Sequence, residues 1–427
     1  MEAKKPRLLS PLLLWFMGTT ILANIAAQMV FPLESLYVQE LGASVEQVGL
    51  FFTIAAIAPL FLQVFGGWLS DSIGRLQAIA IGSVGGALSY LFYIFAHSWV
   101  WLLPASVLTA MAVAFVAPSF QAFIAEESTE ETRGRVYGIT STMFMVVMII
   151  GPILGGLIAQ GLDFKVMYIV AGSLYSAAAV IRVLMARYAS RKSAEKGESV
   201  EKPSLSGFKK SLLAVLGLVT AGGVVTWIFI SDGVRDIAFS LTGRLMPLYL
   251  ENEMGLSLIQ ISGLQSITAI VAMVLMSPAG WLSDKKGERV SIVGGFGLIS
   301  IGWAVFLVGT DFWQFVASRV VIGAGWALID PAYNSLISKA VPDKLRGLAF
   351  GFFSTSLGLI SLPAPWLGAR LWESISPIFP FYVPLVAMVA LLPIMWTKFK
   401  LPADTPDRTQ DPAGGEKAPA DAGSAVG

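Results

Sequence analysis

Charged residues occur inside a long apolar stretch of the sequence, residues 213–250, where hydrocarbon surroundings would make their chemistry unusual. Asp232, Arg235 and Asp236 fall on one face of a helix because they lie three and four residues apart. Two carboxylates beside one arginine either bind and release a proton or neutralise the arginine internally. The sequence leaves both interpretations open. Arg244 is a fourth charged residue of this stretch.

Two other apolar stretches contain ionisable residues. Glu34 lies near the end of the first stretch, after Asn24 and Gln28. A carboxylate partly withdrawn from water can take up a proton near neutral pH, although a residue near a helix end can instead extend to the surface. Arg319 and Asp330 lie about three helical turns apart along one face. The proton-coupling candidates are therefore Glu34, Asp232, Asp236 and Asp330.

The composition identifies the environment of these charges. Hydrophobic residues make up 55% and charged residues 13% of the 427 residues, and the mean hydropathy is +0.72. A soluble protein could not cover so much apolar surface, so we expect an all-α membrane protein. At about 20 apolar residues per span, this length supplies about twelve transmembrane helices. The apolar stretches cover residues 11–37, 46–69, 76–96, 99–124, 136–160, 164–186, 213–250, 257–282, 290–309, 312–338, 346–370 and 377–397.

A hydrophilic segment at 187–210 divides these spans into two sets of six. Basic residues concentrate in loops on one side of the spans, which predicts that both termini are cytoplasmic. We expect a multi-pass protein of the plasma membrane. The end of the chain has no apolar periodicity, so we expect it to be disordered. The expected organisation is a cytoplasmic N-terminus at 1–10, a six-helix bundle at 11–186, a cytoplasmic linker at 187–210, a second six-helix bundle at 211–398 and a disordered cytoplasmic tail at 399–427.

Several function classes are not expected. The chain has no cysteine and one histidine, His97, so we expect neither a disulfide nor a histidine-based metal site. It has no Gly-rich phosphate loop followed by Lys-Ser or Lys-Thr, which argues against ATP as the energy source. A net charge of +1, spread over short loops, does not favour nucleic acid. We therefore expect no enzyme activity, no cofactor, no metal and no nucleic-acid partner.

The two sets of spans share an internal repeat. The segment Gly67-Trp-Leu-Ser-Asp71 recurs 213 residues later as Gly280-Trp-Leu-Ser-Asp284. Further pairs at the same offset are Pro118 with Pro331, Arg133 with Arg346, Gly138 with Gly351, and Pro152 with Pro365. Two homologous halves of six spans predict a carrier whose halves rock about a central site.

The segment from Gly66 to Arg75, and its copy from Gly280 to Arg289, resemble the signature between spans two and three of the major facilitator superfamily. Glycines there allow close helix approach, and a helix N-terminus stabilises a carboxylate such as Asp71 by about 0.3 to 1 kcal/mol. The resemblance implies a gate between the halves, with Glu126 as a partner for Arg75. The expected gate residues are Gly67, Asp71, Gly74, Arg75, Glu126, Arg133, Gly280, Asp284, Gly287, Arg289 and Arg346.

A second motif lies in span five, where Gly138 is followed by Gly151-Pro152-Ile-Leu-Gly155-Gly156. It resembles the signature of twelve-helix drug/proton antiporters, except that Val147 stands where a glycine is usual. Pro152 bends a helix and the glycines permit close packing, so a generic Gly/Pro kink is the alternative interpretation. A third family feature, an arginine in span four, is replaced by Ser106, which departs from the usual pattern of proton coupling.

The resemblance implies a central cavity lined by spans one, four, seven and ten. It favours proton-coupled efflux of amphipathic drug-like compounds by alternating access. The alternative is a proton-coupled carrier of a specific polar or anionic metabolite bound by Arg235 and Arg319. The expected partners are a small-molecule substrate, protons and the lipid bilayer, and the expected state is a monomer. The expected cavity residues are Asn24, Gln28, Met111, Phe115, Gln121, Arg235, Phe239, Arg319, Trp326, Tyr333 and Asn334.

Overall fold

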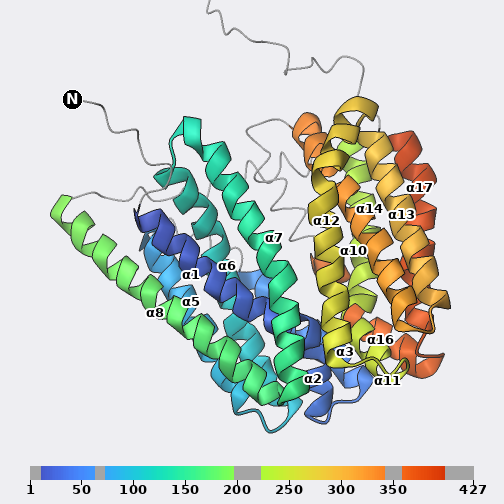
Figure 1. Ribbon diagram of the computed structural model, residues 1–427, viewed down its shortest axis with the longest axis horizontal. Coiled ribbons are helices and arrows are strands. Elements are labelled where there is room, and N and C mark those ends of the chain that lie inside the picture. The colour runs from blue at the N-terminus through green and yellow to red at the C-terminus, as the bar shows by residue number, and fades with distance from the viewer. Residues whose placement is uncertain (1–10, 63–72, 197–222, 342–357, 400–427) are drawn as a thin grey trace, which may run out of the picture.

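The computed structural model describes residues 11–62, 73–196, 223–341 and 358–399 of the chain. All regular structure in these ranges is helical, which confirms the expected all-α class. The helices form two bundles that stand side by side in Figure 1. The N-terminal half, coloured blue to green, makes one bundle, and the C-terminal half, coloured yellow to red, makes the other.

The N-terminal bundle follows the expected order of spans. Its helices are α1 (Pro11–Val30), α2 (Glu34–Glu40), α3 (Val45–Ala55), α5 (Arg75–Ile94), α6 (Leu102–Glu127), α7 (Glu130–Gly161) and α8 (Phe164–Lys196), with 3-10 turns η1 (Phe31–Leu33) and η2 (Trp99–Trp101). Helix α8 therefore continues into the range that we expected to be a linker. The residues there are mainly Ala, Arg, Lys and Glu, which are strong helix formers.

The C-terminal bundle repeats this arrangement. Its helices are α10 (Val224–Gly243), α11 (Met246–Asn252), α12 (Leu258–Lys286), α13 (Glu288–Val308), α14 (Phe312–Ala340), α16 (Ala364–Ser374) and α17 (Tyr382–Lys398), with the 3-10 turn η4 (Phe379–Phe381). The expected boundary of this bundle at residue 211 and most of the expected tail lie outside the described residues.

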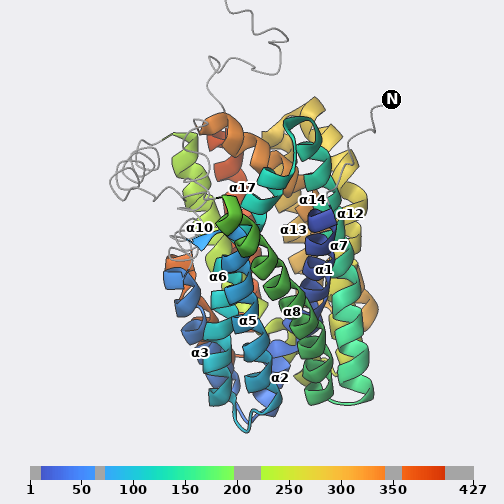
Figure 2. The same ribbon diagram turned by 90° about the vertical axis from the view of Figure 1, so that its left-hand side faces the viewer.

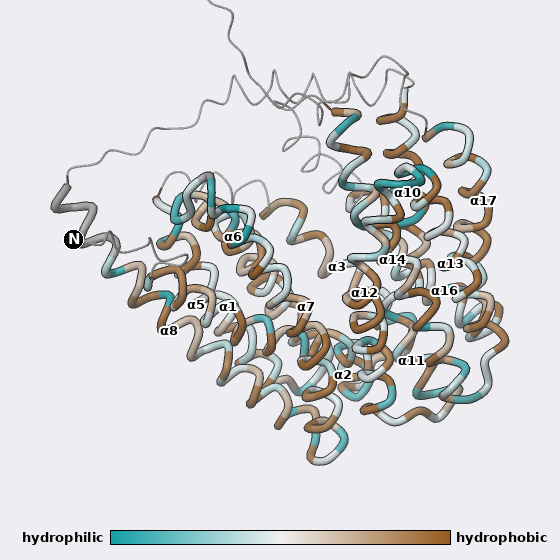
Figure 3. The backbone as a smooth tube through the Cα atoms, turned by 45° about the horizontal axis from the view of Figure 1, so that its top comes forward, coloured by the Kyte–Doolittle hydropathy of each residue, from teal (hydrophilic) through white to brown (hydrophobic). Residues whose placement is uncertain are grey.

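Ten helical segments in the described ranges are long and apolar enough to cross a membrane. The other two expected spans contain α10, which carries Asp232, Arg235 and Asp236, and α16, which covers only 11 residues while residues 342–357 lie outside the described ranges. Figure 3 shows hydrophobic residues along most of the helices and hydrophilic residues gathered at turns. These features fit helices whose outer surfaces face lipid.

The internal repeat extends to the backbone. Positive φ angles, which favour glycine, occur at two positions in each half, namely Gly42 and Gly74, and Gly255 and Gly287. Ser44 and Ser257 each begin a helix with a capping box that includes the glutamine three residues on. All of these pairs keep the offset of 213 residues. The two halves therefore build corresponding turns from corresponding local sequence.

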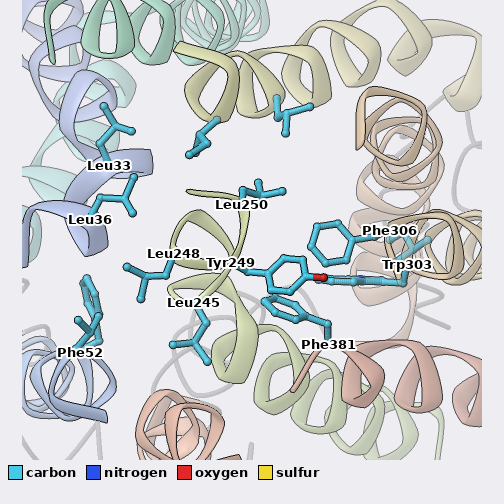
Figure 4. Close-up of a cluster of buried hydrophobic side chains, with 14 of the residues drawn as sticks. Leu33, Leu36, Phe52, Leu245, Leu248, Tyr249, Leu250, Trp303, Phe306 and Phe381 are labelled. Carbon is cyan, nitrogen blue, oxygen red and sulfur yellow. The ribbon is translucent and has the colours of Figure 1, made fainter. Parts of the chain in front are cut away.

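The bundles meet at one end, which we call the closed end, and diverge toward the end at which α1 begins, which we call the open end (Figure 1). At the closed end α3 packs against α16, and α7 packs against α12. A buried apolar cluster fills this region (Figure 4). Within it the ring of Tyr249 lies 5.0 Å from that of Phe381, beside Trp303 and Phe306.

Candidate substrate cavity

A cavity of about 700 Å³ lies between the two bundles. Both halves line it, because its walls include residues of α3 and α6 and residues of α10, α12 and α14. Most of the wall is apolar or aromatic, including Phe52, Val113, Phe239, Trp303 and Trp326. The charged members of the described lining are Glu34, Arg244 and Arg319.

A second cavity of about 510 Å³ lies within the N-terminal bundle, between α1, α5, α6 and α8. Its described lining includes Asn24, Gln121 and Arg182. It adjoins the central cavity, since both are lined by Phe31, Glu34, Tyr93, Thr109, Val113 and Arg244.

The expected cavity residues separate into two groups. Phe239, Arg319 and Trp326 line the central cavity, and Asn24 and Gln121 line the cavity of the N-terminal bundle. The other six are absent from the described lining of both cavities: Gln28, Met111, Phe115, Arg235, Tyr333 and Asn334.

Helix packing explains why two of these six residues do not line either cavity. Gln28 lies against Gly151 of α7, and Met111 lies against Gly85 of α5. A glycine leaves room for a neighbouring side chain, which then fills the helix interface instead of facing the cavity. The family resemblance, which implied that spans one and four line the cavity, could not show which neighbouring helix has a glycine opposite these residues.

Glu34 forms an ion pair that joins the two halves. Its Oε2 lies 3.0 Å from Nη1 of Arg244, and the hydroxyl of Tyr93 donates a hydrogen bond of 2.8 Å to its Oε1. The guanidinium of Arg244 also lies over the rings of Phe31 and Phe52, 4.6 and 4.3 Å from their centroids. Aromatic faces and a carboxylate both stabilise the cation. The pairing of Glu34 with Arg244 was not predicted, because 210 residues separate them in the sequence.

Further polar contacts join the halves at the closed end. Oε1 of Glu46 lies 3.1 Å from Nη1 of Arg370 and accepts a hydrogen bond of 3.3 Å from Nε1 of Trp366. Asn252 donates a hydrogen bond of 3.2 Å to Gln39, a residue that corresponds to it in the repeat. These contacts hold α2 and α3 of one half against α11 and α16 of the other.

A second group of charges lies within the C-terminal bundle. Nη1 of Arg235 is 2.8 Å from Oδ1 of Asp232, and its Nη2 is 3.0 Å from Oδ1 of Asp236. The guanidinium lies 5.7 Å from the centre of the Tyr333 ring. Asp232 is buried, whereas Asp330 is exposed. The arrangement has the shared helix face expected from the sequence, and Arg235 is occupied by two carboxylates.

In the gate motif, corresponding positions of the two halves carry opposite charges. In the N-terminal half, Nε of Arg75 is 3.1 Å from Oε1 of Glu126. In the C-terminal half, Nζ of Lys339 is 2.6 Å from Oε1 of Glu288. Residues 288 and 339 correspond to 75 and 126 at the offset of 213, so the same two positions hold an ion pair of reversed polarity.

The remaining gate residues have separate contacts. Nη2 of Arg133 donates a hydrogen bond of 3.2 Å to the carbonyl oxygen of Ala125, and Nη1 of Arg289 donates one of 3.2 Å to the carbonyl oxygen of Trp396. Asp284 is exposed. The expected gate residues Gly67, Asp71 and Arg346 lie outside the described residues.

The glycines of the span-five motif lie where α7 contacts its neighbours. Gly151 and Gly155 face Gln28 and Met29 of α1. Gly156 faces α12 of the other half, where an added methyl group would lie 2.7 Å from Oγ of Ser262. Pro152 lies within α7, and Gly138 has no neighbour within 4 Å of an added methyl group.

No metal site is evident in the described ranges, where no group of three or more His, Asp or Glu side chains could hold an ion.

Arg182, a charged residue of the cavities, was not among the residues predicted from the sequence, although its position in an apolar stretch could have identified it. It is the only Arg or Lys between residues 166 and 186, in the sixth apolar stretch, and an unpaired charge there is as costly as one in span seven.

Comparisons with known proteins agree with this architecture. The chain is 27% identical over 345 residues, 80% of its length and 86% of the relative's, to an uncharacterized MFS-type transporter of Methanocaldococcus jannaschii. It is 26% identical over 343 residues, 78% and 82% of the two chains, to a protein of Lactococcus lactis named a multi-drug resistance efflux pump PmrA homolog.

Among solved structures, it resembles a bacterial homologue of the iron transporter ferroportin in an inward-facing state, with a TM-score of 0.70 and 14% identity over 90% of this chain and 98% of the other. This likeness concerns the fold. The family model of the Major Facilitator Superfamily matches residues 16–243 and residues 228–425. The protein is therefore a transporter rather than an enzyme, and it belongs to the Major Facilitator Superfamily.

Proposed function

We propose that this transporter exports amphipathic compounds in exchange for protons, by alternating access of the central cavity to the two sides of the membrane. The observation that carries the proposal is a cavity lined by both halves and bordered by the Glu34–Arg244 ion pair, which links the halves. A relative named as a multi-drug resistance efflux pump homolog also supports the proposed export of such compounds.

The substrate class follows from the cavity wall. Phe52, Phe239, Trp303 and Trp326 offer apolar and aromatic surface, and few polar groups interrupt it. Such walls bind the apolar parts of a ligand with little demand on its exact shape. A volume of about 700 Å³ accommodates a compound of drug size.

The coupling proton is assigned to Glu34. While Glu34 is ionised it pairs with Arg244 and holds the closed end together. A substrate that enters the cavity competes for this pair and loosens the closed end. Once the halves separate there, Glu34 loses its cationic partner and takes up a proton from the other side. Asp232, Asp236 and Asp330 are a second set of carboxylates that can carry the coupling proton.

The orientation and setting form part of the proposal. The closed end faces the exterior of the cell, the open end faces the cytoplasm, and both termini are cytoplasmic. Basic residues at the open end, such as Arg75, Arg133 and Lys285, support this orientation. The protein acts as a monomer in the plasma membrane.

Transport in proteoliposomes tests the proposal. An imposed pH gradient should drive a cationic dye against the proton flow, and Glu34→Gln should make dye movement insensitive to the gradient. Glu253→Gln is the matched control, because Glu253 is an exposed carboxylate near the closed end. Dye transport by Glu34→Gln with unchanged sensitivity to pH would exclude Glu34 as the coupling residue.

A proton-coupled carrier of a polar or anionic metabolite is the second candidate. Arg319 favours it, because this arginine lines the central cavity and no described carboxylate lies within 4.0 Å of it. Its described contacts are the sulfur of Met246 and the ring of Phe306. Gradient-driven movement of an organic anion without movement of the dye would favour this candidate.

A further inference from the structure

Arg182 is a buried cation that the proposed coupling mechanism does not use. It lies on α8, is 2% exposed and reaches between α1 and α5, which Figure 2 shows on either side of α8. Its Nε, Nη1 and Nη2 donate hydrogen bonds to the hydroxyls of Thr19, Ser83 and Thr20, at 3.2, 3.0 and 3.2 Å. These partners are all neutral.

The hydroxyls around Arg182 cannot balance its charge. Thr19 and Thr20 donate their own hydrogens to the carbonyl oxygen of Phe16, which leaves their oxygens free to accept from the guanidinium. No carboxylate among the described residues lies within 4.0 Å of Arg182. A guanidinium has five N–H groups, and the three hydrogen bonds use the N–H of Nε and one N–H on each of Nη1 and Nη2. The second N–H on each of Nη1 and Nη2 therefore has no acceptor among these three hydroxyls.

The charged residues that line the two adjoining cavities in the described ranges also leave Arg182 without a counter-ion. Their described linings contain the cations Arg182, Arg244 and Arg319 and one carboxylate, Glu34. Glu34 already neutralises Arg244. The two cavities together therefore have an excess of positive charge, and a low-dielectric wall strengthens its field.

We propose that the cavity of the N-terminal bundle is a subsite for the carboxylate of an amphipathic aromatic anion, with Arg182 as its counter-ion. The two remaining N–H groups, one on each terminal nitrogen, match the two oxygens of a carboxylate. Phe120 and Phe144 line the same cavity and contact the apolar body of the ligand. This inference rests on the proposed function in one respect, namely that the adjoining cavities hold a transported small molecule.

Equilibrium binding to the full-length protein in detergent tests the subsite without any gradient. The probes are 1-pyrenebutyrate and its neutral primary amide, which share an aromatic body and differ in charge. The unmodified protein should bind the carboxylate about tenfold more tightly than the amide, and Arg182→Gln should reduce this preference to about twofold or less. Arg182→Lys should retain part of the preference, because it keeps the charge but loses the paired N–H geometry.

The control is Arg187→Gln, since Arg187 is exposed on the same helix. It should leave the preference unchanged. An Arg182→Gln protein that unfolds at an unchanged temperature and keeps the full preference for the carboxylate would overturn the proposal. Should Arg182→Gln fail to fold, Ala117→Leu narrows the cavity from α6 without altering the arginine, and unchanged carboxylate binding by that variant would overturn it too.

The outcome separates the subsite from the transport mechanism. A carboxylate preference that depends on Arg182, together with dye transport that ignores the pH gradient, would support the subsite and refute proton antiport. Normal antiport with no preference between the two probes would refute the subsite alone.

Discussion

At the scale of single residues, the structure links charges that are far apart in the sequence. Glu34 and Arg244 are each predictable as costly charges in apolar stretches, but their pairing depends on how two bundles meet. The Asp232, Arg235 and Asp236 group could be predicted from helical spacing because all three lie within five consecutive residues. Local spacing therefore predicted the charge group of α10, while the link between the halves required the folded arrangement.

Removal of Arg244 should loosen the closed end. Arg244→Gln leaves Glu34 in apolar surroundings without its cation, which we expect to destabilise the closed end by about 1 to 2 kcal/mol. The expected cost is below that of a fully buried pair, because the side chains of Arg244 and Glu34 are 30% and 17% exposed. The chain has no cysteine, so Leu36→Cys, a buried closed-end position, reports opening through its rate of maleimide labelling.

Arg244→Gln should increase that labelling rate about tenfold, whereas Arg187→Gln should leave it unchanged. Equal rates in the two variants would mean that the ion pair does not hold the closed end.

Glu251 gives the closed end a dependence on pH. It follows the last apolar residue of span seven, and burial together with the negative charge of Glu40 raises the pKa of its carboxyl. For an acid with a raised pKa, the stabilising contribution is present at low pH and is lost as the pH rises through that pKa. The unfolding temperature of Glu251→Gln should therefore fall less than that of the unmodified protein between about pH 4.5 and about pH 7.5.

Glu253→Gln, two residues further on at an exposed position, is the control for Glu251→Gln and should follow the unmodified protein. Identical pH profiles for Glu251→Gln and the unmodified protein would show that folding does not raise the pKa of the Glu251 carboxyl.

At the scale of helices, the span-five motif is explained by close packing. Gly151 and Gly155 admit α1, and Gly156 admits α12 from the other half. The sequence indicated a bent and closely packed helix, but the same residues are compatible with close packing against any neighbouring helix. Which helices α7 contacts follows from the arrangement of the bundles, and the contact of Gly156 with α12 gives this motif a role at the interface between the halves.

Two glycines of α7 should respond in opposite ways to the same substitution. Gly156→Ala places a methyl group against Ser262 and the backbone of Ile259, and we expect it to cost about 1 to 3 kcal/mol. Gly138→Ala meets no atom within 4 Å and should be neutral or stabilising by up to about 1 kcal/mol, because alanine favours helix.

Thermal unfolding in detergent compares these two alanine variants. A lower unfolding temperature is expected for Gly156→Ala only. Equal unfolding temperatures would contradict the assigned contact between α7 and α12.

At the scale of the whole molecule, the repeat made the architecture predictable. Turn glycines, capping boxes and membrane-length apolar stretches act locally, so the order of helices and the two similar halves follow from the sequence. The repeat does not determine which end of the molecule is closed, because both arrangements use the same helices. It also does not conserve charge, as the reversed pairs Arg75–Glu126 and Glu288–Lys339 show.

The most direct test of the proposed mechanism measures the distance across the closed end. Spin labels at Gln39→Cys and Asn252→Cys replace two side chains that form a hydrogen bond between the halves. With Glu34 intact, pulsed electron paramagnetic resonance should give mainly a short distance. Adding Glu34→Gln, which removes the carboxylate that pairs with Arg244, should create or enlarge a population at longer distance, whereas adding Glu253→Gln should not. A distance distribution that Glu34→Gln leaves unchanged would contradict the claim that the Glu34–Arg244 ion pair holds the closed end together.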